Sequence, residues 1–250
     1  MESKRKNFLT ILLIIIIVII VGVIGYLGFD LINGKIKENE AKSITDEFDK
    51  QIPTITEEEL NESLEEEANN SGEENASNPN GNTEQGGSAG SAGNSGSYNR
   101  GSYYNRSYYT NGVNIDGYWV VGTIRIPATG VRYPIFSQPT KSALERGVGM
   151  VYTSNGINQV GNSVLAGHNY RNSLFFSRNK SLVVGNLIFI KDVTGVEMKY
   201  AVTNKFTTNS SDTSFYQRDT TGKAEINLST CTDNGLKTGE RLIITARQED

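Results

Sequence analysis

The sequence predicts an all-β domain of eight strands with short helices in residues 111–250, preceded by a long N-terminal extension. Short apolar runs recur along this segment, and clusters of Gly, Asn, Asp and Pro separate them. Strands do not alternate with long helical patterns, which argues against a parallel α/β sheet. So many short strands in one segment favour a closed barrel or a sandwich, and closure would also remove exposed strand edges.

The predicted strands are rich in β-branched and aromatic residues, and a turn signal follows each of them. They are 118–127 (YWVVGTIRIP), 131–136 (VRYPIF), 149–153 (GMVYT), 162–168 (NSVLAGH), 186–192 (NLIFIKD), 198–208 (MKYAVTNKFTT), 224–231 (AEINLSTC) and 241–247 (RLIITAR). Two further segments, 140–147 (TKSALERG) and 173–180 (SLFFSRNK), have apolar residues at helical spacing and predict short helices.

An uncharged apolar run near the N-terminus predicts a membrane span. The run covers 8–29, 22 residues in all, and a helix of that length extends about 33 Å, enough for a hydrocarbon core of about 30 Å. A cleaved signal peptide is the alternative, but its apolar region would be shorter and no A-x-A cleavage pattern follows here. Lys4, Arg5 and Lys6 precede the run, so the positive-inside rule places residues 1–7 in the cytoplasm and the rest outside.

Residues 30–110 have the composition of an extracellular linker. Their first part is strongly acidic and could form helix in places, interrupted at Pro53, and the rest is nearly all Gly, Ser, Asn and Tyr, which cannot build a core. The Tyr-Asn-Arg-Ser near-repeat in this linker is typical of disordered low complexity, and binding of a partner or of the cell-wall polymer is the alternative. Residues 111–250 hold 15 Lys and Arg against 11 Asp and Glu, a count of +4, although the whole chain carries −4. This mild excess does not suggest a nucleic-acid binder, and the extracellular location argues against nucleic acid as a partner.

Three residues with chemical potential lie at predicted strand ends. Cys231 and His168 are the only cysteine and the only histidine of the chain, and Arg241 opens the last predicted strand. Strand ends can direct side chains to a common mouth, where Cys and His can act as nucleophile and acid–base partner and Arg can stabilise negative charge. A buried thiol, a turn histidine and a surface arginine are the structural alternatives, and each is the better interpretation of its residue taken singly.

Taken together, these residues resemble those of the sortases, membrane-anchored cysteine transpeptidases of mostly Gram-positive bacteria. The family's T-L-x-T-C strand end appears here as NLSTC, 227–231, with Asn227 in place of the usual Thr and Arg241 ten residues after the cysteine. The family's strand-terminal G-H matches Gly167 and His168, and GTIRIP, 122–127, resembles the first strand of the same barrel. The resemblance covers roughly 115–247, and it implies an eight-stranded sortase barrel and a catalytic domain over 111–250.

The resemblance also implies a two-step acyl transfer without a cofactor. Cys231 would attack the Thr–Gly amide of a Leu-Pro-x-Thr-Gly-like C-terminal sorting signal on a secreted protein and form a thioester. His168 would protonate the departing amine and later take a proton from an incoming amine, which resolves the thioester. Arg241 would stabilise the oxyanion or hold the substrate backbone, and Thr230 would help to position the substrate.

The acceptor amine implied by the resemblance is a peptidoglycan precursor, which would make the chain a cell-wall-anchoring enzyme of the cell membrane. A sortase that joins pilin subunits through a lysine is an alternative, although the chain lacks the Asp-Pro-aromatic lid typical of the pilin-polymerising class. A hydrolytic cysteine protease and an inactive stalked adhesion or scaffold module are the others. The loop 153–163 contains no carboxylate, so we predict no calcium site of the kind some sortases have there.

Overall fold

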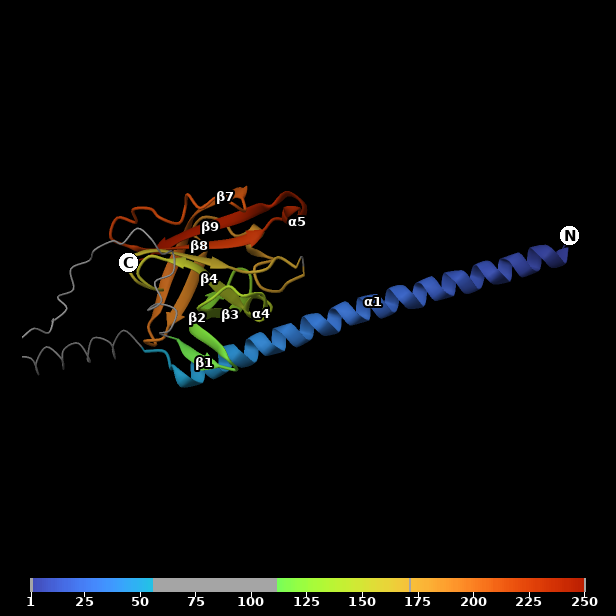
Figure 1. Ribbon diagram of the computed structural model, residues 1–250, viewed down its shortest axis with the longest axis horizontal. Coiled ribbons are helices and arrows are strands. Elements are labelled where there is room, and N and C mark those ends of the chain that lie inside the picture. The colour runs from blue at the N-terminus through green and yellow to red at the C-terminus, as the bar shows by residue number, and fades with distance from the viewer. Residues whose placement is uncertain (1, 56–111, 171, 250) are drawn as a thin grey trace, which may run out of the picture.

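The computed structural model describes residues 2–55, 112–170 and 172–249, and it shows a barrel with one long helix, α1, lying against its side (Figure 1). Most of the predicted linker, 56–110, lies outside the described residues. Its first part, 30–55, is described and differs from the prediction, as set out below.

Eight strands form the closed barrel, as the sequence predicts. The strands are β2 (Tyr118–Ile126), β3 (Val131–Phe136), β4 (Val148–Thr153), β5 (Gly161–Ala166), β6 (Leu187–Asp192), β7 (Glu197–Asn209), β8 (Ala224–Cys231) and β9 (Glu240–Gln248). They are ordered β2-β3-β4-β5-β8-β9-β7-β6, and pairing of β6 with β2 closes the sheet. The β3–β4 and β5–β8 pairs are parallel, and the other pairs are antiparallel. A short strand that the sequence did not predict, β1 (Val113–Ile115), pairs with β2 outside the barrel.

The short helices agree with the prediction only in part. Helix α4 (Lys141–Leu144) lies within the predicted segment 140–147, and the hydroxyl of Thr140 caps it by accepting a hydrogen bond from the Ala143 N–H. The predicted helix at 173–180 is wrong: these residues form bends and turns that lead into a 3₁₀ turn, η1 (Asn179–Ser181). The reason is local, because Phe175 adopts a positive φ of 50° and its N–H donates to the Tyr133 hydroxyl. Helix α5 (Gly235–Thr238), in the β8–β9 connection, was not predicted.

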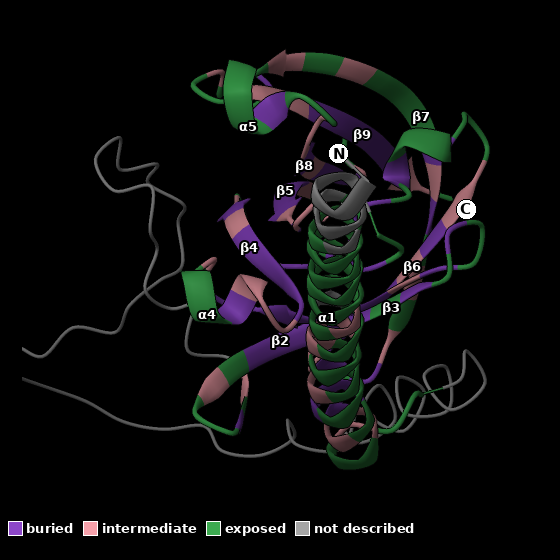
Figure 2. Ribbon diagram, turned by 90° about the vertical axis from the view of Figure 1, so that its right-hand side faces the viewer, coloured by how far each residue is buried: buried purple, intermediate pink, exposed green. Residues whose placement is uncertain are grey.

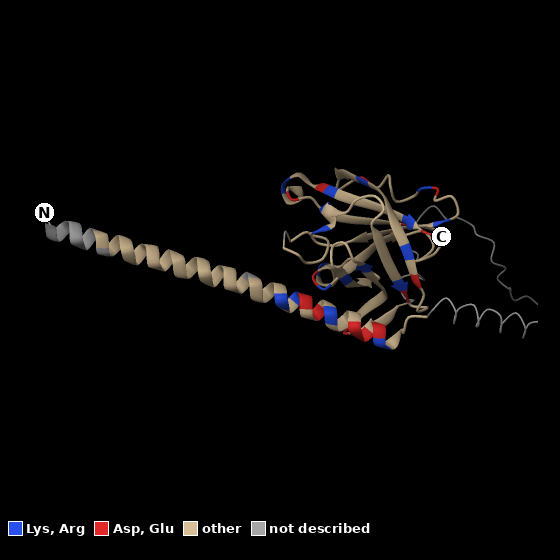
Figure 3. Cartoon of the chain, turned by 180° about the vertical axis from the view of Figure 1, so that it is seen from behind, with Lys and Arg blue, Asp and Glu red and all other residues tan. Residues whose placement is uncertain are grey.

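Helix α1 runs from Glu2 to Gln51 and combines two different segments. Its large apolar side chains from Leu9 to Ile36 are exposed, by 42% at Leu12 and up to 72% at Leu31, as expected of a span that lacks its membrane. One helix of the described residues is long and apolar enough to cross a membrane, and it is this one. Figure 3 shows that charged side chains appear on α1 where the helix reaches the barrel.

The C-terminal part of α1 packs against the barrel instead of starting a linker at residue 30. Ala41, Ile44 and Phe48 lie at helical spacing and are buried at 0%, 3% and 0% exposure. Ile44 and Phe48 share a cluster with Val120 of β2 and Phe136 of β3, outside the barrel. The barrel interior takes other residues of the same strands, such as Ile124 and Ile135. Because both faces of β2 are covered, its sequence reads as a nearly continuous apolar run (Figure 2).

Ion pairs fasten the same part of α1. Arg132 donates hydrogen bonds to Asp46 and Asp49, at 2.7 and 2.6 Å, and this raises the pKa of the Arg132 guanidinium. Lys191, whose side chain is only 4% exposed, pairs with Asp49 at 2.6 Å and donates to the Ile52 carbonyl at 2.7 Å. A buried ammonium needs such partners to offset the loss of water. These contacts fix α1 to the barrel.

Candidate active site

The ends of β5 and β8 bring His168 and Cys231 to one end of the barrel. The two strands are parallel, and Ala166 pairs with Ser229. Beyond this pair, the Gly167 N–H donates to the Ser229 carbonyl at 3.1 Å, and the Thr230 hydroxyl donates to the Gly167 carbonyl at 2.7 Å. One residue past His168, the Asn169 amide donates to the Cys231 carbonyl at 2.9 Å, so the chain around His168 stays beside the end of β8. Both side chains are half-buried, so both reach the surface of the mouth.

The packing of Phe176 requires a glycine at position 167, directly before His168. A Cβ atom at Gly167 would approach the ring of Phe176 to 2.7 Å, closer than real Cβ contacts come. Phe176 is fully buried, and its N–H donates to the carbonyl of His168 at 3.1 Å. Only glycine therefore lets the loop after His168 fold back onto the end of β5.

Arg241 lies directly across from Cys231. The two residues are register partners in the antiparallel β8–β9 pair, and an Arg241 guanidinium N–H donates to the Cys231 sulfur. The short helix α5 lies in the connection from Cys231 at the end of β8 to Glu240 at the start of β9. Gly235 begins this helix, and a Cβ there would meet the Glu240 carbonyl at 2.4 Å and the Cβ of Cys231 at 3.1 Å. The arrangement places a permanent positive charge beside the only thiol of the chain.

The environment of His168 favours its neutral form. Burial is the main cause that lowers the pKa of the imidazole, and the positive charges of Lys37 and Arg241 lower it further, while Glu145 acts in the opposite direction. The ring of Tyr170 lies 4.8 Å from that of His168, at an angle of 33°. At neutral pH a histidine with a lowered pKa is a competent proton acceptor.

Thr230 is buried, at 4% exposure, and its hydroxyl donates to the Gly167 carbonyl. It therefore fastens the strand that ends in Cys231 to the strand that leads to His168. Asn227, which departs from the family pattern, is fully buried on the same strand. Its amide donates to Asn162 at 2.8 Å and accepts from the Thr245 hydroxyl at 2.6 Å, so it joins β5, β8 and β9. Asn162 and Thr245 thus supply hydrogen-bond partners for the asparagine that stands where the family pattern has Thr.

Sequence reasoning missed several residues of this mouth. Asn169 donates to the carbonyl of Cys231 at 2.9 Å and to Asp233 at 3.2 Å, and Lys180 donates to Asp233 at 2.8 Å. Asn169 follows the histidine in the sequence, but an isolated amide in a polar turn carries no signal of this contact. Lys37 was assigned to the linker, although it reaches the hydroxyl of Tyr170 at 3.2 Å.

A cavity of about 230 Å³ opens beside Cys231, between the loop that follows His168 and the start of the β8–β9 connection. Its lining includes the apolar residues Phe176 and Leu242 and the polar residues Asn169, Lys180, Thr207, Thr230 and Asp233. A peptide bond or an amine bound in this cavity would lie next to the thiol.

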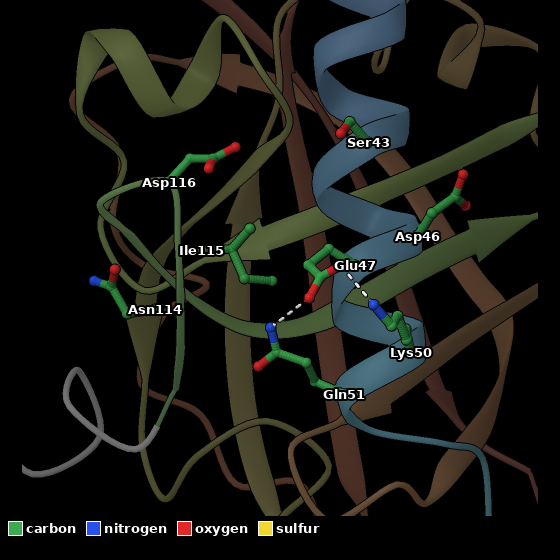
Figure 4. A pocket seen from close by; sticks show the side chains of 8 residues that line it. All are labelled: Ser43, Asp46, Glu47, Lys50, Gln51, Asn114, Ile115 and Asp116. Atoms are coloured by element: carbon green, nitrogen blue, oxygen red, sulfur yellow. Dashed lines mark hydrogen bonds and ion pairs between the residues drawn. The ribbon is translucent and has the colours of Figure 1, made fainter.

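A larger cavity, of about 610 Å³, lies elsewhere, between α1 and the β1 segment (Figure 4). Its lining includes Asp46, Glu47, Lys50, Gln51 and Asp116, and Glu47 contacts both Gln51 and Lys50. Glu47, Lys50 and Gln51 thus have interaction partners within the lining itself, and no candidate catalytic residue borders this cavity. Within the described residues, no group of three or more His, Cys, Asp or Glu side chains is placed to hold a metal ion.

Comparison with known proteins identifies the family. A family model of the sortase domain matches residues 124–249, half of the chain, and the chain therefore belongs to the sortase family. No curated protein matches. Among solved structures, sortase A from Corynebacterium diphtheriae is 27% identical, with 53% of this chain and 62% of that chain covered and a TM-score of 0.48.

Two further solved structures are similar. Sortase C-1 from Actinomyces oris is 27% identical, with coverage of 52% of this chain and 74% of that one and a TM-score of 0.47. Sortase A from Listeria monocytogenes is also 27% identical, with 52% and 88% covered and a TM-score of 0.46. The matched part of this chain thus spans less than two thirds of the C. diphtheriae chain.

Proposed function

We propose that the protein is a membrane-anchored cysteine transpeptidase, held by α1 with residues 1–7 in the cytoplasm and the barrel outside. It would cleave a Leu-Pro-x-Thr-Gly-like sorting signal of secreted proteins and transfer them to an amine of a cell-wall precursor. Membership of the sortase family supports this reaction class. The observation that carries the proposal for this chain is the hydrogen bond from Arg241 to the Cys231 sulfur at the strand end that adjoins His168.

The arrangement suits acyl transfer at Cys231. The Cys231 thiol gives its proton to the neutral His168 as its sulfur attacks the carbonyl carbon of the Thr–Gly amide, and the carbonyl oxygen takes up the negative charge of the tetrahedral intermediate. Arg241, whose guanidinium already reaches the sulfur, is in position to stabilise that oxygen or the thiolate. When the intermediate collapses, the C–N bond breaks, the thioester forms, and the departing glycine amine takes a proton from His168.

The second step reverses the proton transfer. An incoming primary amine attacks the thioester carbon, its proton passes to the neutral His168, and the Cys231 sulfur leaves. The lowered pKa of His168 suits this base role, because the imidazole is already unprotonated at neutral pH. Thr230 serves the reaction by holding the end of β8 against Gly167.

A peptide assay tests the proposal. The full chain in detergent is incubated with a library of peptides varied around Leu-Pro-x-Thr-Gly, alone and with either a glycine-terminated peptide or a lysine-containing peptide. Cys231→Ala is the matched inactive control. We expect ligation to the glycine amine and a mass shift on Cys231 that corresponds to the thioester.

The other outcomes each identify a different function. Ligation only to the lysine side chain would indicate a pilin-joining sortase. Hydrolysis without ligation would indicate a protease. Absence of turnover across the library, in a chain that is folded, would indicate an inactive scaffold and overturn the proposal.

A further inference from the structure

The candidate active site and the apolar span lie toward the same end of the molecule. Lys37 of α1 donates to the hydroxyl of Tyr170, and a Cβ at Gly34 would lie 3.8 Å from Leu174, so this part of α1 adjoins the loop that follows His168. The end of α1 is at the opposite end of the barrel, where Ile55 forms a bridge with Val196 in the β6–β7 hairpin. Figure 1 shows α5 at the end of the barrel that faces the N-terminal part of α1.

The distance along the helix from the span to this loop is short. Gly34 and Lys37 come five and eight residues after Phe29, the last residue of the uncharged run. At about 1.5 Å per residue, these steps correspond to roughly 8 and 12 Å. A bilayer about 40–45 Å thick with a core of about 30 Å has an interfacial layer of roughly 5–8 Å on each side. Tyr170 and Leu174 therefore come to the outer edge of this layer when the helix stands upright.

The connection between span and barrel is stiff. Helix α1 continues without interruption from Glu2 to Gln51, and Pro53 follows only after its end. The part beyond Gly34 is held by the buried Phe48, by the ion pairs of Arg132 described above, and by a contact of Arg146 with Glu40 at 3.2 Å. A barrel attached in this way cannot turn freely about its anchor, as it would on a flexible linker.

The end of the barrel seen along α1 from its N-terminal side includes α5, β8 and β5 (Figure 2). Leu236 of α5 is 80% exposed, and Lys237 beside it is exposed as well. An aliphatic side chain next to a lysine suits the boundary between acyl chains and headgroups. Asp233, just before α5, contacts Asn169, so α5 and the loop after His168 belong to one surface.

From this geometry we infer that α1 holds the barrel with the Cys231 mouth directed at the bilayer, and that Leu236 and Lys237 rest in the lipid headgroup layer. The inference rests on the membrane anchoring proposed above. The substrates would then be peptides and amines that a membrane-held carrier presents within about 10 Å of the bilayer surface. The barrel does not have to reach into the cell wall for them.

Fluorescence quenching by lipids tests the orientation. In a Cys231→Ala background, Leu236→Cys or Val160→Cys gives a chain with a single thiol for an environment-sensitive fluorophore. Val160 is a matched control, because it is also an exposed aliphatic residue, at 54%, and directly precedes β5 at the opposite end of the barrel. The labelled full-length chains are reconstituted into phosphatidylcholine–phosphatidylglycerol vesicles that carry a headgroup-attached quencher. We expect loss of most of the fluorescence at position 236 and little loss at position 160.

Flotation of the same vesicles separates the two proposals. A chain that floats with the vesicles but shows equal quenching at both positions, or stronger quenching at 160, overturns the orientation and leaves the anchoring intact. A chain that does not float overturns the anchoring and the orientation together.

A helical insertion provides a second test that changes only the height of the barrel. Seven helix-forming residues inserted between Ile32 and Asn33 add about 10 Å and nearly two full turns, so the barrel keeps its rotation. We expect the quenching at position 236 to fall to the level at position 160. The same insertion, made in a chain that keeps Cys231, should leave the turnover of a soluble peptide unchanged. The same seven residues inserted after Gly87 should leave the quenching as it was. Quenching at 236 that persists after the first insertion contradicts the inference.

Discussion

The ammonium of Lys37 lies over the ring of Tyr170, 4.6 Å from its centroid, and also donates to its hydroxyl. Tyr170 in turn packs against the imidazole of His168. A residue of the helix that carries the apolar span therefore acts on the candidate acid–base residue in two ways. It supports the ring that contacts His168, and its positive charge disfavours the imidazolium form.

We predict that Lys37→Gln raises the pKa of His168, because one of the positive charges that lower it is removed. His168 is the only histidine of the chain, so its imidazole signal in an NMR titration of a protein without a histidine tag is unambiguous. The wild-type midpoint should lie below the ordinary value of about 6.5, and the midpoint of Lys37→Gln above that of the wild type. The acid limb of the pH–rate profile should move to higher pH in the same variant.

Lys37→Arg is the matched control for this titration, since it keeps the charge. Its midpoint should stay close to that of the wild type. An unchanged midpoint in Lys37→Gln would show that the charge of Lys37 does not contribute to the pKa of His168.

The direction of the His168 shift also predicts how stability depends on pH. The folded chain binds the histidine proton less readily than the unfolded chain does, so the contribution of His168 is fully present above the unfolded pKa of about 6.5 and is lost as the pH falls toward the folded pKa. The difference in free energy of unfolding between wild type and His168→Gln should therefore shrink as the pH is lowered from 7.5 to about 5. Urea unfolding at several pH values measures it. A difference that grows over this range would contradict the sign of the shift.

We predict that Cys231 reacts with thiol reagents in the native protein, because it is half-buried at a mouth and lies beside a guanidinium. Mass spectrometry after alkylation should find one modified residue and complete loss of activity. Prior binding of a sorting-signal peptide should slow the modification. Protection of the thiol until denaturant is added would favour a structural role for this cysteine.

The barrel could be predicted from the sequence, whereas the role of α1 could not. Each of the eight strands has its own apolar run and turn signal, and their bounds agree within a few residues with those observed. The segment 36–52 has the same acidic composition as the linker after it, and this masked the helical spacing of Ala41, Ile44 and Phe48. The contacts of Asn169 and Tyr170 depend on how the loop after β5 folds back, and no local pattern encodes that.

The packing of α1 makes a prediction about truncation. A chain from residue 111, where the predicted catalytic domain begins, would expose Val120 and Phe136, which α1 covers. We expect it to be less stable than a chain from residue 34. Phe48→Ala in the longer chain should cost about 3–5 kcal/mol of unfolding free energy, as for other buried phenylalanines.

Lys50→Ala on the same helix is the control, because its side chain is 80% exposed and its contact with Glu47 is long, at 3.8 Å. Its change in unfolding free energy should stay within about 0.5 kcal/mol. Urea unfolding of the four chains gives the comparison. Equal stability of the chains from residues 34 and 111 would show that α1 only rests on the barrel.

The last prediction concerns the three candidate catalytic residues as a unit. Arg241 of β9 pairs with Cys231 at the end of β8, His168 follows the end of the neighbouring strand β5, and no second histidine exists in the chain to replace it. Loss of a general acid–base residue typically costs about 10²–10⁴-fold in rate, and loss of an oxyanion donor about 10²–10³-fold. We expect kcat/KM to fall by such factors in His168→Ala and in Arg241→Ala. The double variant should lose far less than the product of the two, because residues that act on one transition state are not additive.

Arg241→Lys separates a chemical role from a structural one. Lysine keeps the charge but lacks the planar set of donors, so it should restore little of the activity while the barrel stays folded. Circular dichroism and unfolding curves of every variant give the control. Near wild-type turnover in either folded single variant would remove that residue from the site. A loss in Arg241→Ala that follows its loss of stability, together with full rescue by lysine, would make Arg241 a residue that only holds β9 against β8.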